Sequence, residues 1–441
     1  MRYRSYGHII LLIGDIAVFY LSLWLALLVR NAQLPSAESY IDHALPFSLL
    51  GAIWLVVFLI FGLYGKYISL LRQRVPSLVL QSQVVNVLIA AGLFYIVPFF
   101  DIAPKTTLVI YAVYSSVMLI VWRVYAPILF TAHPESAVLV GNGAEYDELH
   151  EEIRRGTYPI TITKRVSAEE FVANDKAVLG DDVSYVVAPV DSARQETDIS
   201  TGLYRILTNE SLQVVDFISL YEEVFRRLPL RACDESWLVR HISIGPHNIY
   251  DGMKRVIDIV LGSVMFICSL PFIVFGALLV WLSDFRTPFF SHYRIGQNGK
   301  KIRVVKLRTM PFHRNKDGDA RELKPTRIGM FLRVSRIDEL PQLLGVVTGS
   351  LSLIGPRPEL PAYVEQYERE IPYYGLRHSV KPGLSGWAQI VHKNPPKFAV
   401  GVEQTRQKLS YDLYYLKNRS LALDVLIILR TVIELAQRRG V

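Results

Sequence analysis

The sequence predicts a membrane protein that begins with a four-helix transmembrane domain and continues with α/β structure. Two observations lead to this fold class. The 441-residue chain is 51 % hydrophobic with a mean hydropathy of +0.27, and its apolar residues gather in long runs. Residues 133–250 instead alternate short strand-like and helix-like stretches. A chain of this length has room for two or three domains.

Four apolar runs open the chain, at residues 8–29, 44–64, 79–100 and 107–122. A spanning helix needs about 20 apolar residues, which the first two runs supply. The third has polar residues early, and the fourth is short unless Arg123 extends its side chain to the interface. The first contains Asp15, is too long for a signal peptide and is followed by no cleavage site. We therefore expect residues 1–132 to form a transmembrane domain.

Loop charges predict the orientation of these helices. Arg2 and Arg4 precede the first run, and further Lys and Arg residues lie between the second and third, whereas residues 31–43 contain neither. Basic loops favour the cytoplasmic side, so the N-terminus and the chain after four crossings are expected there. An acid inside a membrane is a functional candidate. Asp15 lies near the cytoplasmic end, which favours a structural role.

Residues 133–250 are predicted to form a small Rossmann-like domain. SAVLVGNGAEYDELHEEI is typical of a strand, a glycine turn and a helix; VSYVVAPV and LQVVDFISL indicate further strands, with a helical pattern at 201–209. The dinucleotide fingerprint needs three glycines, and Tyr146 stands where the third would follow Gly141 and Gly143. We therefore expect a structural or regulatory domain, with dinucleotide binding as the alternative.

A fifth apolar run, residues 256–282, is about 40 Å long as a straight helix, enough to span a bilayer. Basic residues flank it on both sides, which argues that both ends are cytoplasmic. Pro271 is expected to kink the helix, and Ser269 could hydrogen-bond a carbonyl that the kink frees. A helix that dips into the membrane and returns explains these features, and so does a kinked spanning helix.

The C-terminal part has three basic, glycine-containing motifs around one acidic pair. They are YRIGQNGKKIRVVKLRTM (293–310), IGPRPE (354–359) and VKPGLSGWAQI (380–390). Arginine grips phosphate oxygens, and glycine lets backbone donors approach them, so the motifs predict a cationic pocket. The acidic pair is Asp338 and Glu339. It could instead be an ordinary helix start with Ser335 as its N-cap.

The order and spacing of these motifs resemble those of the large monotopic polyprenyl-phosphate sugar-1-phosphate transferases. These bacterial phosphoglycosyl transferases initiate exopolysaccharide, O-antigen or related glycan assembly. The resemblance runs from KRVIDIVLG through KLRTM, SRIDELPQLLGVVTGSLSLIGPRPE and VKPGLSGWAQ to YDLYYLKNRSLALDVLIILRTV. It implies an α/β catalytic domain at 251–441 with a re-entrant helix at 256–282. The four membrane helices and the Rossmann-like insert also match large members.

In that family the acidic pair is the catalytic dyad, which the resemblance places at Asp338 and Glu339. It implies that the aspartate attacks the β-phosphorus of a UDP-sugar, releases UMP and passes the sugar phosphate to undecaprenyl phosphate. The family requires Mg²⁺, for which Glu339 and Asp338 are the expected ligands. The phosphate-binding candidates are Arg294, Lys306, Arg308, Arg336, Arg357 and Lys381.

Two positions depart from the family pattern. Ser350 stands where the family often has an acid, and VHKNPP follows the WAQ motif where a Gly-Arg pair is common. The first leaves no acid at position 350 to act in catalysis, and the second leaves the sugar-side contacts undefined. The sequence does not identify the sugar: glucose, galactose and an N-acetylated or diamino sugar all stay open. Asp412, Tyr414 and Tyr415 of YDLYYLKN are expected to be packing groups.

The charge and cysteine content set further limits. A net charge of +8 is typical of a protein that contacts anionic lipid or phosphates. No zinc-finger spacing, basic zipper or aromatic-basic platform occurs, so we expect no nucleic acid. Cys233 and Cys268 form no disulfide framework, which fits a reducing compartment.

The expected partners are a UDP-sugar, undecaprenyl phosphate and membrane lipid, with a homodimer left open. The expected location is the bacterial inner membrane, with the catalytic domain on its cytoplasmic face. The alternatives are a membrane-anchored nucleotide or redox sensor and a non-catalytic scaffold for polysaccharide assembly.

Overall fold

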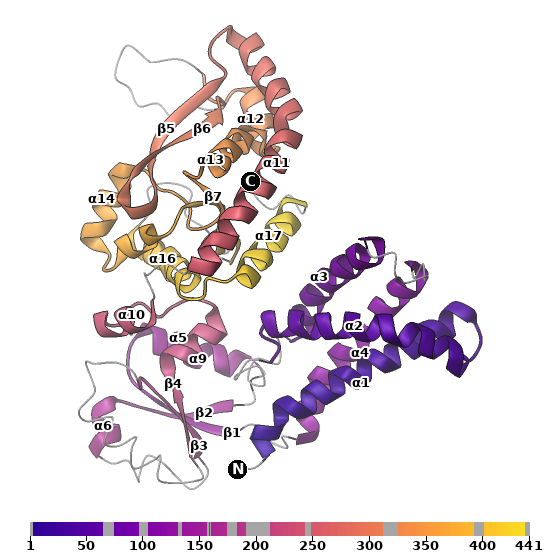
Figure 1. Ribbon diagram of the computed structural model, residues 1–441. Coiled ribbons are helices and arrows are strands. Elements are labelled where there is room, and N and C mark those ends of the chain that lie inside the picture. Colours follow the sequence, from indigo (N-terminus) through magenta and orange to yellow (C-terminus); the bar gives the residue numbers. More distant parts are fainter. Residues whose placement is uncertain are drawn as a thin grey trace. The chain divides into compact units, whose positions relative to one another are not determined.

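The computed structural model describes residues 3–64, 75–96, 105–130, 135–156, 158, 160–173, 183–190, 212–242, 248–311, 325–391 and 401–436 (Figure 1). The chain forms two compact units, Met1–Val224 and Phe225–Val441. The first contains the N-terminal helices and a parallel sheet, and the second contains α10 (Glu235–His241), the long helix α11 (Asn248–Asp284) and the elements after it.

All four predicted N-terminal helices form. Their bounds are α1 Tyr3–Asn31, α2 Ala37–Ile60, α3 Val75–Ile96 and α4 Lys105–Phe130. Within the described ranges, α1, α2, α4 and the later α11 are long and apolar enough to cross a membrane, whereas the apolar part of α3 is shorter, Leu78–Phe94. Polar residues of this helix form hydrogen bonds inside the bundle: Gln83 donates to Ser115 at 2.9 Å, and Asn86 donates to Gln83 at 2.9 Å.

The fourth helix is longer than its apolar run, and Arg123 within it is buried in the bundle. Its side chain is 2 % exposed and ion-paired with Asp15, which is fully buried. Arg123 also donates to the carbonyl of Leu63 at 2.6 Å, and Tyr64 donates to Asp15. A buried pair avoids two isolated charges in an apolar bundle, so the cluster ties α1, α4 and the end of α2 together.

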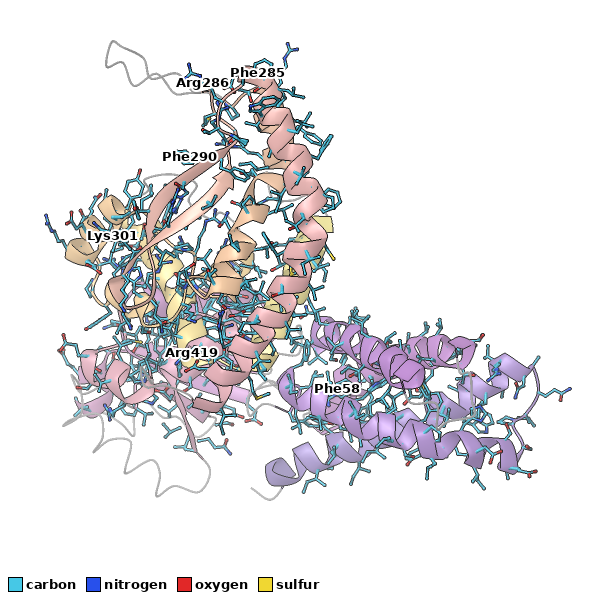
Figure 2. All side chains as sticks on the ribbon, turned by 45° about the horizontal axis from the view of Figure 1, so that its top comes forward. Phe58, Phe285, Arg286, Phe290, Lys301 and Arg419 are labelled. Atoms are coloured by element: carbon cyan, nitrogen blue, oxygen red, sulfur yellow. The ribbon has the colours of Figure 1, made fainter. Side chains whose placement is uncertain are left out.

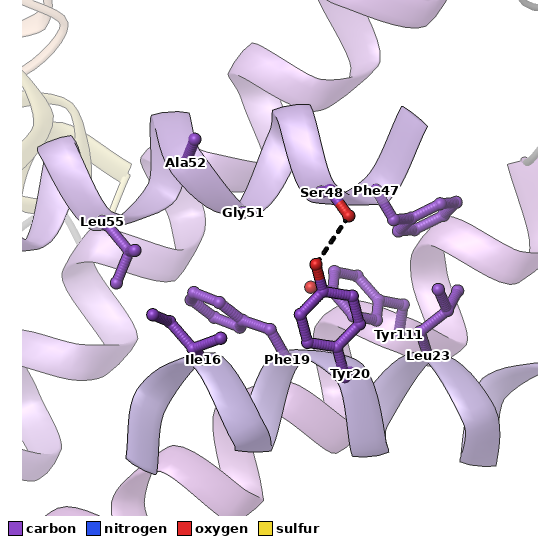
Figure 3. A pocket seen from close by; sticks show the side chains of 10 residues that line it. All are labelled: Ile16, Phe19, Tyr20, Leu23, Phe47, Ser48, Gly51, Ala52, Leu55 and Tyr111. Carbon is purple, nitrogen blue, oxygen red and sulfur yellow. Dashed lines mark hydrogen bonds between the residues drawn. The ribbon is translucent and has the colours of Figure 1, made fainter. Parts of the chain in front are cut away.

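A cavity of about 200 Å³ lies between α1 and α2 (Figure 3). Its lining is mainly apolar, and the hydroxyls of Tyr20 and Ser48 lie 2.8 Å apart at its edge. The lining residues are Ile16, Phe19, Tyr20, Leu23, Phe47, Ser48, Gly51, Ala52, Leu55 and Tyr111.

The insert contains a four-stranded parallel sheet in the order β2-β1-β3-β4, as expected for a Rossmann-like domain. The predicted strand at LQVVDFISL is wrong beyond Asp216, where helix α9 begins, and the predicted helix at 201–209 lies outside the described residues. The bounds are β1 Glu135–Val140, β2 Ile160–Val166, β3 Val183–Ala188, β4 Gln213–Asp216, α5 Ala144–Arg155, α6 Ala168–Ala173 and α9 Phe217–Phe225.

An aromatic ring fills the space against the glycine turn between β1 and α5. Gly141 and Gly143 have φ values of 135° and 129°, which favour glycine. A Cβ on Gly141 would come within 2.3 Å of the Tyr146 ring, which stacks on Phe217 at a centroid distance of 3.7 Å. The glycine at 141 therefore makes room for this buried ring.

The expected boundary at residue 250 differs from the observed division, because residues after Val224 pack with the C-terminal unit. The Trp387 indole donates to the carbonyl of Arg226 at 2.9 Å, and Arg231 pairs with Glu403 at 2.9 Å. This segment contains α10 Glu235–His241, and it contacts α15 Trp387–Val391 and α16 Val402–Lys417.

Helix α11, Asn248–Asp284, is continuous through Pro271. Pro271 has no N–H for the carbonyl of Ile267, and the expectation that Ser269 would bond this freed carbonyl is wrong. Ser269 instead donates to the carbonyl of Phe266 at 2.8 Å. The dip and return of α11 in a membrane stay a prediction.

One face of α11 packs on the C-terminal unit along its length. Arg255 donates to the carbonyls of Val346 and Val347 at 2.8 Å, and Asp258 accepts from the backbone of Leu353 at 3.0 Å. Val280 lies in a small core of buried residues. Large apolar side chains elsewhere on the helix are exposed, up to Phe285 just after its end (Figure 2).

The remaining elements form a compact support for the acidic pair. An antiparallel hairpin of β5 Phe289–Ile295 and β6 Lys301–Leu307 lies beside it, and a second sheet pairs β7 Ser352–Ile354 with β8 Gly383–Ser385 in parallel. The other bounds are α12 Arg327–Val334, η4 Ile337–Gln342, α13 Leu343–Thr348, α14 Pro361–Glu370, η5 Tyr374–Ser379 and α17 Leu421–Ala436.

Candidate active site

The acidic pair lies on the short 3₁₀ helix η4, immediately after α12. The alternative in which Ser335 caps this helix is wrong, since Ser335 ends α12 and donates to the carbonyl of Phe331 at 2.8 Å. Arg336 follows in the left-handed conformation with φ 59°. Such a conformation costs about 1 kcal/mol or more for a non-glycine residue, so the chain turns sharply just before Asp338.

The hairpin β5–β6 brings a lysine to the acidic pair. Leu307 and Leu332 pack with Val280 in the small core, and Ile337 at the start of η4 packs against them. This packing fixes β6 beside η4. The ammonium of Lys306 consequently lies 2.6 Å from Oε1 of Glu339.

Glu339 is the centre of the charged cluster. Besides Lys306, it pairs with Arg336 at 3.5 Å and with Arg357 at 3.5 Å. Three of the six predicted phosphate-binding residues are thus gathered around one carboxylate. These long cations lie in one place because η4, β6 and the turn after β7 converge there.

The two acids have opposite electrostatic environments. Burial would raise the pKa of Glu339, but Arg357, Lys306 and Arg336 outweigh it and hold that pKa at about 2. Burial and the neighbouring charge of Glu339 raise the pKa of Asp338 above its usual range, partly offset by Lys306, Arg333 and Arg336. Asp338 is 7 % exposed, and its carboxylate makes no hydrogen bond or ion pair with the described residues. Glu339 is therefore paired with cations, whereas both carboxylate oxygens of Asp338 are available to attack a substrate.

The other three predicted phosphate-binding residues have different surroundings. Arg308 makes two hydrogen bonds to Asp284 at the end of α11 and donates to the carbonyl of Thr287 at 3.0 Å. Arg294 donates to the carbonyl of Pro358 at 2.7 Å and to Nε2 of His292 at 2.8 Å. Lys381 precedes β8, and no ion pair of its ammonium is found among the described residues.

The glycines of the predicted cationic pocket serve backbone packing. A Cβ on Gly355 would lie 2.4 Å from the carbonyl oxygen of Lys381, and one on Gly383 would lie 2.1 Å from the Gly355 nitrogen. The IGPRPE and VKPGLSG motifs therefore touch backbone to backbone, which the pairing of β7 with β8 requires. The motifs predict that these glycines let backbone N–H groups approach phosphate. The N–H groups of Gly355 and Gly383 instead donate to the carbonyls of Ser385 and Pro356.

Comparisons with known proteins identify the family of the C-terminal part of the chain. Residues 249–438 match the family described as bacterial sugar transferase. The chain is 37 % identical over 193 residues to a UDP-glucose:undecaprenyl-phosphate glucose-1-phosphate transferase of Caulobacter vibrioides, covering 42 % of this chain and 71 % of that protein. It is 36 % identical over 197 residues to the exopolysaccharide production protein PSS of Rhizobium leguminosarum, covering 43 % and 98 %. This chain belongs to the bacterial sugar transferase family.

A third relative is matched over less of its length. The chain is 40 % identical over 194 residues to a UDP-N-acetylgalactosamine-undecaprenyl-phosphate N-acetylgalactosaminephosphotransferase of Aeromonas hydrophila, covering 43 % of this chain and 45 % of that protein. The match therefore spans less than half of the Aeromonas relative.

The site of this sugar transferase also contains residues that the sequence motifs do not indicate. His292 lies close enough to Arg294, Lys306 and Arg357 that burial and these cations lower its pKa to about 4. The sequence signal was its place on β5 two residues before Arg294, facing the same side of the hairpin.

A buried ionic cluster lies beneath the turn that carries Arg357. Arg377 pairs with Asp412 at 2.7 Å, and both side chains are 2 % exposed. Lys408 pairs with Glu359 in the same cluster. Asp412 therefore has a structural partner, in agreement with its expected packing role, while Tyr415 donates to Asp424 at 2.9 Å. Only burial reveals this cluster, because no local motif distinguishes Arg377 from a surface arginine.

The donor set of the sugar transferase fits Mg²⁺ held partly by substrate. No group of three or more His, Cys, Asp or Glu residues that could hold a metal is found in the described ranges. Magnesium commonly binds one or two carboxylates together with phosphate oxygens and water. Asp338 and Glu339 are two adjacent carboxylates, so they fit an ion that arrives with a diphosphate and not an ion caged by protein alone.

Proposed function

We propose that this sugar transferase moves a sugar 1-phosphate from a UDP-sugar to undecaprenyl phosphate and thereby initiates assembly of a bacterial glycan. The observation that carries the proposal is the unpaired carboxylate of Asp338 beside three cations that a second acid, Glu339, gathers. Family membership supports the reaction class. The names of the Aeromonas and Caulobacter relatives supply the donor and acceptor classes.

The proposed chemistry has two transfers. An oxygen of Asp338 forms a bond to the β-phosphorus, the bond from that phosphorus to the bridging oxygen breaks, and UMP leaves with the electron pair. An oxygen of the lipid phosphate then bonds to the same phosphorus, and the aspartate oxygen leaves as a carboxylate. A carboxylate needs no general base for this attack, because it is ionised near neutral pH.

The cations overcome the repulsion between an anionic nucleophile and an anionic substrate. Lys306, Arg336 and Arg357 are within ion-pair distance of Glu339 and could turn to the diphosphate when it binds. Arginine holds phosphate oxygens in a bidentate way, which suits Arg357 in its rigid turn. Magnesium, bound by the diphosphate with Glu339 and Asp338, would supply further charge neutralisation.

The placement of the reaction follows from the membrane helices. The lipid phosphate lies at headgroup level, so a domain held there by α11 can meet it without drawing the phosphate into water. We place the catalytic unit on the cytoplasmic face of the inner membrane, where the basic loops put the chain after α4.

The test is UMP release by the full-length protein in membranes that contain undecaprenyl phosphate and Mg²⁺, with a panel of UDP-sugars. The panel includes UDP-glucose, UDP-galactose and UDP-N-acetylgalactosamine, since two relatives named above differ in their sugar. Release of UMP with one of them, together with a polyprenyl-diphosphate sugar, is expected. A full panel without UMP would favour the scaffold alternative.

A further inference from the structure

The turn Pro356–Glu359 is held by its carbonyl groups. Pro356 and Pro358 have no N–H, so this segment has few backbone donors with which to fix itself. The carbonyl of Pro356 accepts from the backbone of Gly383 at 3.0 Å, and that of Glu359 from the backbone of Ile295 at 2.9 Å. Two different segments, β8 and β5, therefore hold the two ends of the turn.

The two central carbonyls are held by arginine side chains. Arg294 donates to the carbonyl of Pro358 at 2.7 Å, and Arg377 donates to the carbonyl of Arg357 at 3.1 Å. Four successive carbonyls thus each accept one hydrogen bond. The bond from Arg377 acts on the residue whose guanidinium faces Glu339.

Arg377 is itself fixed from three sides. Its side chain is 2 % exposed, pairs with Asp412 at 2.7 Å and lies 3.7 Å from Glu359. It also donates to the hydroxyl of Tyr374 at 2.7 Å. A buried arginine with these partners has one preferred orientation, so its bond to the Arg357 carbonyl has a fixed direction.

We propose that Arg377 is a positioning residue, which sets the direction in which the turn presents Arg357 to the reacting phosphates. The inference rests on the proposed function, because phosphates are what Arg357 would meet. Pro356 and Pro358 fix their own φ, and Pro358 also favours the extended region for Arg357, so a limited rotation of the Arg357 carbonyl within that region is the freedom left to the turn. Arg377 removes that freedom.

Arginine suits this position better than lysine. Its planar fork has five donors, and three of its interactions here are with Asp412, Tyr374 and the Arg357 carbonyl. One ammonium cannot reproduce that fork. Arg377→Lys should keep the buried charge opposite Asp412 and lose the bond to the turn.

The experiment is a double-mutant cycle on the full-length protein, with Arg377→Lys and Arg357→Ala. Arg377→Lys is expected to lower kcat/KM for UMP release by about tenfold when Arg357 is present, which is the effect of one hydrogen bond to a charged group. It should have less than about a twofold effect in the Arg357→Ala background. Equal losses in both backgrounds would show a merely structural role and overturn the proposal.

Asp424→Asn is the matched control. Asp424 is buried in the same unit and accepts from Tyr250 and Tyr415 at 2.9 Å, but it belongs to a separate cluster around Lys254. Its effect should be the same with and without Arg357. Coupling of Asp424 to Arg357 as large as that of Arg377 would also overturn the proposal.

A second cycle measures UDP affinity in the same variants and needs no turnover. A wild type that releases no UMP would reject the proposed function alone, since coupling between Arg377 and Arg357 in UDP binding still decides the positioning role. If Arg377→Lys does not fold, the pair Arg377→Met with Asp412→Asn takes its place, because it removes both buried charges together.

Discussion

The glycine turn at residues 141–143 and the proline turn at residues 356–358 differ in the side chain beside each turn: an aromatic ring at the first and a guanidinium at the second. The glycine turn ends a parallel strand and opens a helix, as in a dinucleotide site, yet the Tyr146 ring lies against Gly141. The proline turn follows the three-residue strand β7 and opens no helix directly, yet it points a guanidinium at a cluster of charges.

This difference separates a motif from the site that it predicts. A glycine fingerprint binds phosphate because its backbone can approach the ligand, and a side chain in that space removes the advantage. A turn whose backbone N–H groups do not bind phosphate can still bind an anion when it holds one arginine side chain in a fixed direction. We infer that nucleotide chemistry belongs to the C-terminal unit and not to the Rossmann-like insert.

The largest expected effect is that of Asp338→Asn. This substitution keeps the shape of the side chain and removes the negative oxygen, so activity should fall by on the order of 10³ or more while the fold persists. The measurement uses a UDP-sugar labelled in its β-phosphate without lipid acceptor, followed by mass spectrometry of the peptide that contains residue 338. Near-normal UMP release by a folded variant would contradict the nucleophilic role of Asp338, whose carboxylate caps no helix in the described structure.

A smaller loss is expected for Glu339→Gln. The change removes a proposed magnesium ligand and the acid that gathers Lys306, Arg336 and Arg357. Activity should fall about 10- to 100-fold, in the range typical of weakened metal binding. The check is a magnesium titration of UMP release: partial recovery at high Mg²⁺ is expected, and a loss that no Mg²⁺ concentration changes would argue against metal positioning.

How much of this site the sequence reveals depends on how local each interaction is. Asp338, Glu339, Lys306, Arg336 and Arg357 stand in motifs, and the structure gathers them around η4. The apolar runs likewise predict the N-terminal helices, because bilayer length acts on each segment separately.

Interactions between distant segments could not be predicted in this way. Arg308 stands in the same motif as Lys306, but it follows the end of β6 at Leu307, and it pairs with Asp284 instead. The Asp15–Arg123 pair and the pair of Arg377 with Asp412 join residues far apart in the chain, which spacing does not reveal. The packing of residues 225–241 on α15 and α16 likewise joins segments that are distant in sequence.

The pH dependence of the first transfer should report Asp338. Its pKa is raised, whereas Glu339, with a pKa of about 2, stays ionised through the usual range. Activity should therefore fall as the pH drops through the pKa of Asp338, because the protonated acid cannot attack. In Glu339→Gln the neighbouring negative charge is gone, so the acid limb should move to lower pH.

The profile is measured as UMP release in a single turnover without lipid acceptor. The lipid acceptor is left out because its phosphate titrates near pH 6. With the acceptor present, the second transfer would add a pH dependence of its own to the profile. An acid limb that stays in place in Glu339→Gln would show that another group governs it.

The smallest effect is expected at the glycine turn, where the comparison is sharpest. NADH should neither bind the full-length protein nor change UMP release, because the ring of Tyr146 fills the space against Gly141 and the third fingerprint glycine is absent. Tyr146→Phe keeps the ring and its stacking on Phe217, so it should leave activity within about twofold of wild type, as expected for a change that leaves packing intact. The binding measurement is NADH fluorescence against the full-length protein, with Tyr146→Phe as the matched control. Stoichiometric NADH binding by the wild type would show that the glycine turn of the insert binds a dinucleotide and would contradict the assignment of nucleotide chemistry to the C-terminal unit alone.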